Sequence, residues 1–239
     1  MGRAFEYRKA TKFKRWNAMS KTFTRIGKQI AMAVKAGGPL PENNTRLRIL
    51  VQNAKGAQMP KANIESAIKK AAEKDQGNFE EVTYEGYGPY GVAIVVDTAT
   101  DNTNRTVANV RSYFNKYNGS FGSQGSVTFM FETKALFRIT NKNYVIEDIE
   151  LELIDAGLEE VDLDLETNEL VIITDFNDFG KMQTALEALQ CEIQSSDIQR
   201  FPTVYKEITA EQEEAVYKLI DKLEEDEDVN HVYHNIKVG

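Results

Sequence analysis

The chain has 239 residues, a length that suggests about two domains, and its content of 41% hydrophobic and 10% aromatic residues excludes a wholly disordered protein. The longest strongly apolar run, residues 91–96, is far shorter than the roughly 20 residues that span a bilayer. The first residues form no apolar signal core, and the single cysteine, Cys191, cannot form an internal disulfide bond. We therefore expect a cytoplasmic protein with no membrane partner.

The net charge of −8 conceals a strong asymmetry between the two ends of the chain. Residues 1–77 contain 17 Lys/Arg and 5 Asp/Glu, a net of +12, whereas residues 78–239 contain 12 Lys/Arg and 32 Asp/Glu, a net of −20. Such an asymmetry indicates that the N-terminal third binds an anionic partner. The alternative is a solvated basic surface that has no partner.

The first 17 residues interleave cations with aromatic side chains and show no clean helical or strand period. Guanidinium and ammonium groups neutralise phosphates, and aromatic rings stack on bases, so this segment is a candidate nucleic-acid contact. The alternative is a tail whose aromatic residues fold back onto the core. The candidate contact residues are Arg3, Arg8, Lys9, Lys12, Lys14 and Arg15.

Residues 19–34 are predicted to form an amphipathic helix with one basic face, because apolar residues recur at intervals of three and four. The apolar positions are Phe23, Ile26, Ile30 and Val34. The cations on the opposite face are Lys21, Arg25, Lys28 and Lys35. No carboxylate occurs between Glu6 and Glu42, whereas a merely solvated face usually mixes both signs. We expect this face to be exposed and to contact a phosphate backbone.

Two further amphipathic helices are predicted, one capped at Asn44 or Thr45 and one that starts near Pro60. Together with the first they make a small helical bundle, which a linker at residues 76–78 follows. Three cations of the second helix lie outside its core stripe and join the candidate contacts: Arg46, Arg48 and Lys55.

The rest of the chain alternates between strand and helix patterns. The expected strands are 92–98, 126–131, 135–140, 159–164, 169–174, 192–200, 203–208 and 229–236, and the expected helices are 103–117, 145–156, 178–189 and 210–225. The order β-α-β-β-α-β is that of a ferredoxin-like unit, and the flanking elements make a second such unit cut in half. We therefore predict an α+β protein with an N-terminal three-helix bundle and two ferredoxin-like α/β domains, one inserted into the other. The expected domains are residues 1–77, residues 78–131 plus 201–239, and the inserted residues 132–200.

Two glycine-rich loops are further candidates. Residues 84–91 carry Tyr87 and Tyr90 among glycines that let a ligand approach closely, so both tyrosines are candidate nucleic-acid contacts; the alternative is an irregular lead-in to the strand that follows. Residues 119–126 resemble a phosphate-binding loop but lack its lysine and its following helix. We interpret that segment as a flexible connector that can touch a nucleic-acid backbone.

No combination of residues indicates catalysis. The two histidines, His231 and His234, fall on opposite faces of a predicted strand, and Cys191 has no partner base. The acidic run at residues 224–228 is interpreted as a solvated helix end. We therefore predict no catalytic residue, no metal site, no cofactor and no small-molecule substrate.

Six motifs in order resemble those of the YebC/PmpR family. They lie at residues 21–25, 44–48, 59–65, 84–89, 100–106 and 125–127. The resemblance implies a cytoplasmic protein of three domains, one helical and two α/β, that binds DNA and regulates transcription. The chain departs from the family pattern in two places. Where the family usually opens with Gly-His-Ser-Lys-Trp, this chain has Gly-Arg-Ala-Phe-Glu at residues 2–6, and Tyr90 replaces a glycine of the family's Gly-Pro-Gly-Gly. Because both segments can touch nucleic acid, the identity of the target is not carried over.

Two functions account for the charge. The first is a DNA-binding transcriptional regulator. The second is a ribosome-associated translation factor that binds RNA, as implied by relatives that include a mitochondrial translational activator. Phosphate contacts carry no sequence information, so they do not separate these two functions. Against DNA binding, residues 36–44 form a long linker rather than the tight turn of a helix-turn-helix. The family description favours transcription.

Overall fold

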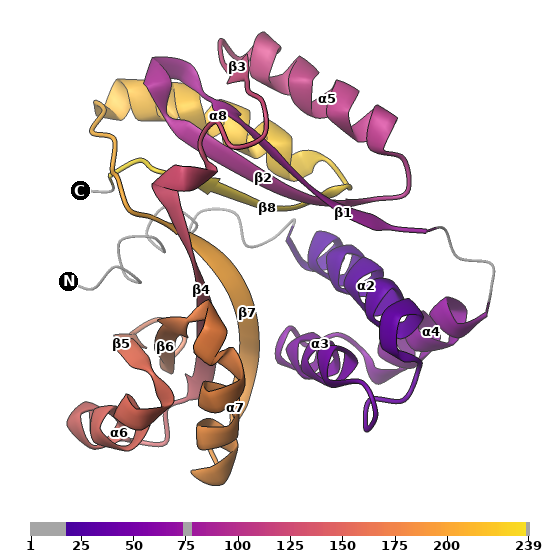
Figure 1. Ribbon diagram of the computed structural model, residues 1–239, viewed down its shortest axis with the longest axis vertical. Helices are drawn as coiled ribbons and strands as arrows, with labels where there is room; N and C mark the ends of the chain where they lie inside the picture. Colours follow the sequence, from indigo (N-terminus) through magenta and orange to yellow (C-terminus); the bar gives the residue numbers. More distant parts are fainter. Residues whose placement is uncertain (1–17, 74–77, 238–239) are drawn as a thin grey trace.

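The computed structural model describes residues 18–73 and 78–237 (Figure 1). The first described domain is the expected bundle of three helices: α2 (Ala18–Gly37), α3 (Thr45–Gly56) and α4 (Lys61–Ala72). Apolar side chains at the predicted positions Ile26, Ile30 and Val34 are buried against the other two helices. Of the two candidate caps, Asn44 caps α3: its side chain accepts a hydrogen bond from the Leu47 amide and is itself buried.

The second domain is a four-stranded antiparallel sheet covered by two helices on one face. Its strands are β1 (Glu80–Tyr87), β2 (Ala93–Thr100), β3 (Ser120–Phe121) and β8 (Val229–His234), and its helices are α5 (Thr103–Lys116) and α8 (Ala210–Glu225). The strand order is β3-β1-β2-β8. Phe114 of α5 and Leu219 of α8 are fully buried in one core with Ile94 of β2.

The third domain lies in the sequence between β3 and α8. Its elements are β4 (Phe131–Thr140), α6 (Ile146–Leu153), β5 (Leu158–Asp164), β6 (Glu169–Asp175), α7 (Phe179–Ala188) and β7 (Ile193–Pro202). The strand order β5-β6-β4-β7 is the ferredoxin-like order. The fold class is therefore confirmed: a helical bundle precedes two sheet domains, one of which is inserted into the other.

Three predictions about the second domain are wrong in detail. Residues 84–87 belong to strand β1, which pairs on both sides and was not predicted. Its three glutamates and one glycine have low strand propensity, which tertiary pairing overrides. Residues 126–130 do not form a strand but a turn followed by a short 3₁₀ helix. Residues 203–208 make only an isolated bridge between Lys206 and Ile236.

The bundle is fixed to the inserted domain through α3, which covers the edge strand β7 (Figure 1). The Asn53 side chain donates to the Ser196 carbonyl at 2.7 Å and accepts from the Ser196 amide at 2.9 Å, as a neighbouring strand would. The contact is so close that a Cβ atom on Gly56 would lie 2.0 Å from the carbonyl oxygen of Gln194. The helix thereby pairs backbone groups that an open sheet edge leaves unpaired.

Among residues 18–73 and 78–237, no helix is both long enough and apolar enough to span a membrane.

Candidate nucleic-acid interface

The basic face of α2 is partly covered by the second domain. Lys28 donates to the Asp228 carboxylate at 2.9 Å and to the carbonyl oxygens of Glu227 at 2.7 Å and Ala99 at 3.2 Å. Its side chain is only 12% exposed. The expectation that Lys28 belongs to an open basic face is therefore wrong, because helical periodicity does not reveal that another domain packs against the polar side.

Arg25 lies at the same contact. Its guanidinium donates to the carbonyl oxygen of Glu224 at 3.4 Å. Burial lowers the pKa of Arg25, and the charge of Glu224 opposes that shift. Like Lys28, Arg25 joins two domains in this structure and does not lie on an open surface. Lys21, near the start of α2, is half-buried.

Asp228 also connects α2 to the second domain. It lies at the end of the acidic run and is 4% exposed, so the interpretation of that run as a solvated helix end is wrong for this residue. It accepts hydrogen bonds from Lys28, Arg105, Thr100 and Thr106. Burial raises its pKa, but these hydrogen bonds outweigh burial and hold it at about 2. The sequence signal for its burial is that the apolar strand β8 begins at the next residue.

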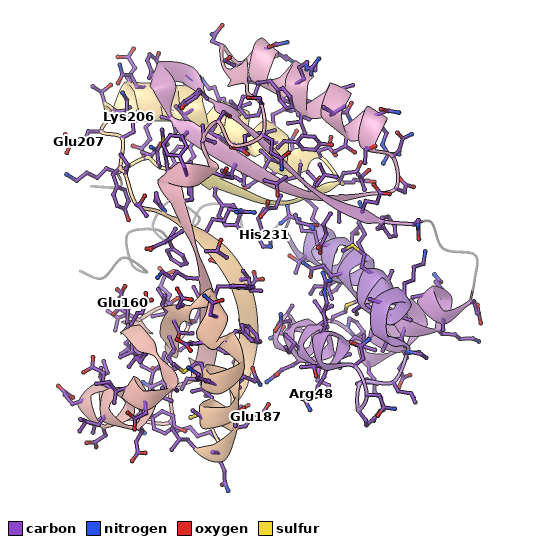
Figure 2. The ribbon with its side chains drawn as sticks, viewed as in Figure 1. Arg48, Glu160, Glu187, Lys206, Glu207 and His231 are labelled. Carbon is purple, nitrogen blue, oxygen red and sulfur yellow. The ribbon has the colours of Figure 1, made fainter. Side chains whose placement is uncertain are left out.

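The other cations predicted for the bundle are exposed. Lys35 donates to the side chain of Asn78 at 3.3 Å, and Arg46 forms an ion pair with Glu81. Arg48 and Lys55 are exposed, and neither has a carboxylate partner within the described part of the chain. They lie seven residues apart and so share one face of α3, about 10 Å apart along its axis. Figure 2 shows Arg48 on the side of α3 away from the sheet of the second domain.

The remaining predicted contacts differ in what surrounds them. Tyr87 is half-buried, and its hydroxyl donates to the carbonyl oxygen of Ser126 at 3.2 Å, so it holds a loop in place. Tyr90 is 52% exposed and has a left-handed backbone conformation with φ of 62°. This conformation is rare for a large side chain and often marks a functional position. The tail residues predicted to bind lie outside the described residues: Arg3, Arg8, Lys9, Lys12, Lys14 and Arg15.

The loop at residues 119–128 binds a carboxylate of the same chain through its backbone amides. The buried carboxylate of Glu85 accepts hydrogen bonds from the amides of Gly125 at 2.6 Å, Val127 at 2.8 Å and Thr128 at 2.9 Å. Burial raises the pKa of Glu85, and these hydrogen bonds lower it further than burial raises it. The segment interpreted as a flexible connector is thus fixed to β1.

No group of three or more His, Cys, Asp or Glu residues in the described ranges has the arrangement of a metal site. His231 lies 3.7 Å from the carboxylate of Asp197, and His234 packs edge-on against Tyr217. Burial lowers the pKa of His234 to about 4. Its Nδ1 accepts a hydrogen bond from the amide of Ile236 at 3.3 Å, as a neutral ring can.

The pKa of His234 predicts a loss of stability in mild acid. Between pH 6.5 and about 4 the unfolded chain binds a proton that the folded chain does not, so the free energy of unfolding should fall as pH drops through this range. Thermal melts of the His234→Asn variant should show a flatter dependence on pH than the parent. His231→Asn is the matched control and should retain the fall. An equal pH dependence in all three proteins would contradict the assignment.

The geometry defines a three-domain α+β protein whose basic helical bundle contacts both acidic sheet domains. Models of the TACO1/YebC protein N-terminal domain and of the TACO1/YebC second and third domain match residues 3–74 and 79–236. The chain belongs to this family.

Relatives from several bacteria match almost the whole chain. Proteins of Parabacteroides distasonis and Flavobacterium johnsoniae are each 56% identical, the first over 99% of this chain and 97% of the relative, the second over 99% of both. A protein of Porphyromonas gingivalis is 55% identical over 99% of this chain and 98% of the relative. All three are named probable transcriptional regulatory proteins.

A solved structure has the same fold. The crystal structure of a conserved hypothetical protein, Aq1575 from Aquifex aeolicus, is 37% identical with a TM-score of 0.80 and covers 92% of this chain and 90% of that chain.

Proposed function

We propose that this chain is a DNA-binding regulator of transcription that contacts the phosphate backbone through the exposed face of α3 and through the cations between Arg3 and Arg15. The observation that carries the proposal is the pair Arg48 and Lys55, two exposed cations on one helix face with no carboxylate partner among the described residues. The names of the relatives support the regulatory role.

The charge of the bundle supports the same partner. Residues 18–73 contain ten Lys/Arg and three Glu, a net of +7. Without Lys28 and Arg25, which contact the second domain, residues 18–73 keep a net charge of +5. Cations that neutralise phosphates release the counterions condensed on the nucleic acid, and this release favours binding. Since α3 is held against β7, its cations are presented on a rigid element, which lowers the entropy lost on binding.

The partner is therefore a nucleic acid, and the proposed location is the cytoplasm. No cofactor or small-molecule substrate enters the proposal. Phosphate contacts alone do not distinguish a duplex of DNA from folded RNA, so binding of the two polymers has to be compared directly.

Salt-dependent binding of duplex DNA tests the proposal. If about six phosphates are neutralised, affinity should fall roughly 10³-fold between 50 and 200 mM salt. The Arg48→Gln/Lys55→Gln variant should bind more weakly, and the slope of log affinity against log salt should flatten by about two units. Fluorescence anisotropy titrations at several salt concentrations give both quantities.

A matched control removes the same charge from α4. Lys61 and Lys69 are exposed but lie near Glu65 and Glu73, at 3.6 and 3.9 Å. The Lys61→Gln/Lys69→Gln variant should bind nearly as the parent does. A parent affinity that does not depend on salt would contradict the electrostatic contact, and tighter binding of folded RNA than of duplex DNA would favour the translational role.

A further inference from the structure

A second basic surface lies in the acidic part of the chain. Residues 102–131 contain Arg105, Arg111 and Lys116 but no Asp or Glu, although residues 78–239 as a whole have a net charge of −20. The net charge of residues 78–239 therefore does not reveal that residues 102–131 contain no acidic residue. Its residues form α5, the short strand β3 and the loop that Glu85 holds.

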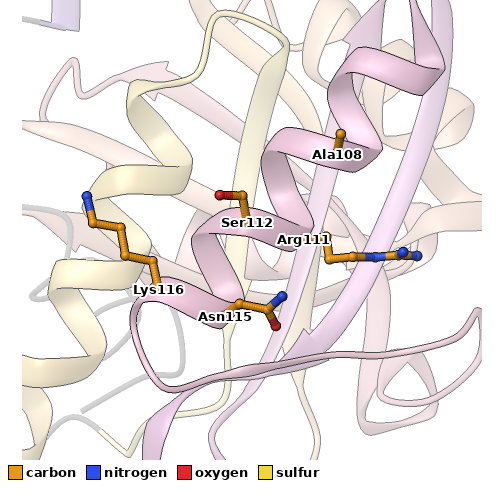
Figure 3. A pocket seen from close by; sticks show the side chains of 5 residues that line it. All are labelled: Ala108, Arg111, Ser112, Asn115 and Lys116. Atoms are coloured by element: carbon orange, nitrogen blue, oxygen red, sulfur yellow. The ribbon is translucent and has the colours of Figure 1, made fainter.

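The outer face of α5 is open to solvent and carries several polar side chains. A shallow, open depression lies on this face. Figure 3 shows Arg111 and Lys116 extending to opposite sides of the helix. The side chains that line it are Ala108, Arg111, Ser112, Asn115 and Lys116. The small side chains of Ala108 and Ser112 leave the middle of the face open.

The two cations on this face are available to a partner. Neither Arg111 nor Lys116 has a carboxylate partner among the residues that the structure describes, whereas Arg105 is paired with Asp101 and Asp228. The Arg111 guanidinium lies 5.1 Å from the centre of the Phe121 ring, and the Lys116 ammonium lies 5.6 Å from that of Tyr117. These rings restrict the side chains without neutralising them, so the charges are preorganised.

We propose that the outer face of α5 is a second contact surface for a nucleic-acid backbone, distinct from the one on α3. This inference rests on the proposed function, since it assigns a second surface to the same class of partner. Two cations that diverge across a helix fit successive phosphates of an extended backbone better than one isolated phosphate. Ser112 and Asn115 supply hydrogen-bond donors for the phosphate oxygens between them.

A protein partner fits this face less well. The core of a protein interface is rich in aromatic and other apolar side chains, whereas α5 carries no large exposed hydrophobic residue.

The outer face of α5 lies far from the cations of α3. In Figure 1 the sheet of the second domain lies between α5 and the helical bundle. The basic surfaces on α3 and α5 therefore reach different segments of a long nucleic acid.

Titration of a long DNA duplex tests the inference. The Arg111→Gln/Lys116→Gln variant should bind more weakly than the parent, and its salt slope should be flatter by about two units. The control variant Lys181→Gln/Lys218→Gln removes the same charge at exposed lysines that are paired with Asp178 and Glu214. It should bind as the parent does.

A second variant avoids the rings that pack under the cations. Ser112→Glu places a negative charge in the middle of the exposed face and should also weaken binding, with an unchanged melting temperature. If both α5 variants are folded and bind as the parent does while Arg48→Gln/Lys55→Gln weakens binding, the inference is overturned and the proposed function stands. If the parent itself does not bind the duplex, the proposed function fails and the inference fails with it.

Discussion

The Asp228→Ala variant is expected to lose about 3–5 kcal/mol of unfolding free energy, because removing one partner of a buried ion pair leaves the other charge uncompensated. In this variant the Lys28 ammonium, which is 12% exposed, loses its carboxylate. The hydroxyls of Thr100 and Thr106 lose the same acceptor. Urea denaturation of the parent and the variant measures the difference.

The neighbouring residue Glu227 provides the control. It is exposed, and its contact with Lys28 is made by its carbonyl oxygen, so Glu227→Ala should change stability by less than about 0.5 kcal/mol. The pKa of Asp228 is lowered from 3.8 to about 2, so its contribution to stability should also depend on pH. Its ionised form stabilises the fold above about pH 4, and this stabilisation should vanish as pH falls towards 2. Asp228→Ala with parental stability would show that the contact between α2 and the second domain is not formed.

Removal of the Glu85 carboxylate is expected to have the second largest effect. The Glu85→Ala variant leaves the amides of Gly125, Val127 and Thr128 without their acceptor, two of them at buried or half-buried positions. Each donor left unpaired in the interior costs roughly 1–3 kcal/mol, so we expect a total loss of about 3 kcal/mol or more. Denaturation curves measure the loss, and hydrogen exchange should show faster exchange at these amides.

The control for this prediction lies on the same strand. Glu81 is exposed and pairs with Arg46 at the surface, so Glu81→Ala should cost less than about 1 kcal/mol. Glu85→Gln keeps one acceptor oxygen and should fall between the parent and Glu85→Ala. A Glu85→Ala protein as stable as Glu81→Ala would contradict the role of Glu85 in fixing the loop.

The parts of the fold that depend on local periodicity were predictable from the sequence. The spacing of Ile26, Ile30 and Val34 predicts the face of α2 that is buried, and the inserted domain follows from its β-α-β-β-α-β order. The errors in the second domain arise from long-range pairing. Residues 126–131 have a strand-like composition, but Glu85, more than 40 positions earlier, binds the amides that a strand would use.

The candidate site was predictable only in part for the same reason. Periodicity separates the polar face of a helix from its apolar face, yet it does not show which polar face another domain covers. Arg25 and Lys28 are held by carbonyl and carboxylate oxygens from around residues 224–228, nearly 200 positions away in the chain. Arg48 and Lys55 differ from them only in tertiary position.

Sequencing of nucleic acid crosslinked to the protein in cells identifies the polymer that the protein binds. We expect recovery of chromosomal DNA from regions upstream of genes, with a smaller yield from cells that express the Arg48→Gln/Lys55→Gln variant. The parallel strain with Lys61→Gln/Lys69→Gln should give the parental yield. Recovery of ribosomal RNA in place of chromosomal DNA would show that the protein does not act on DNA and would assign it to translation.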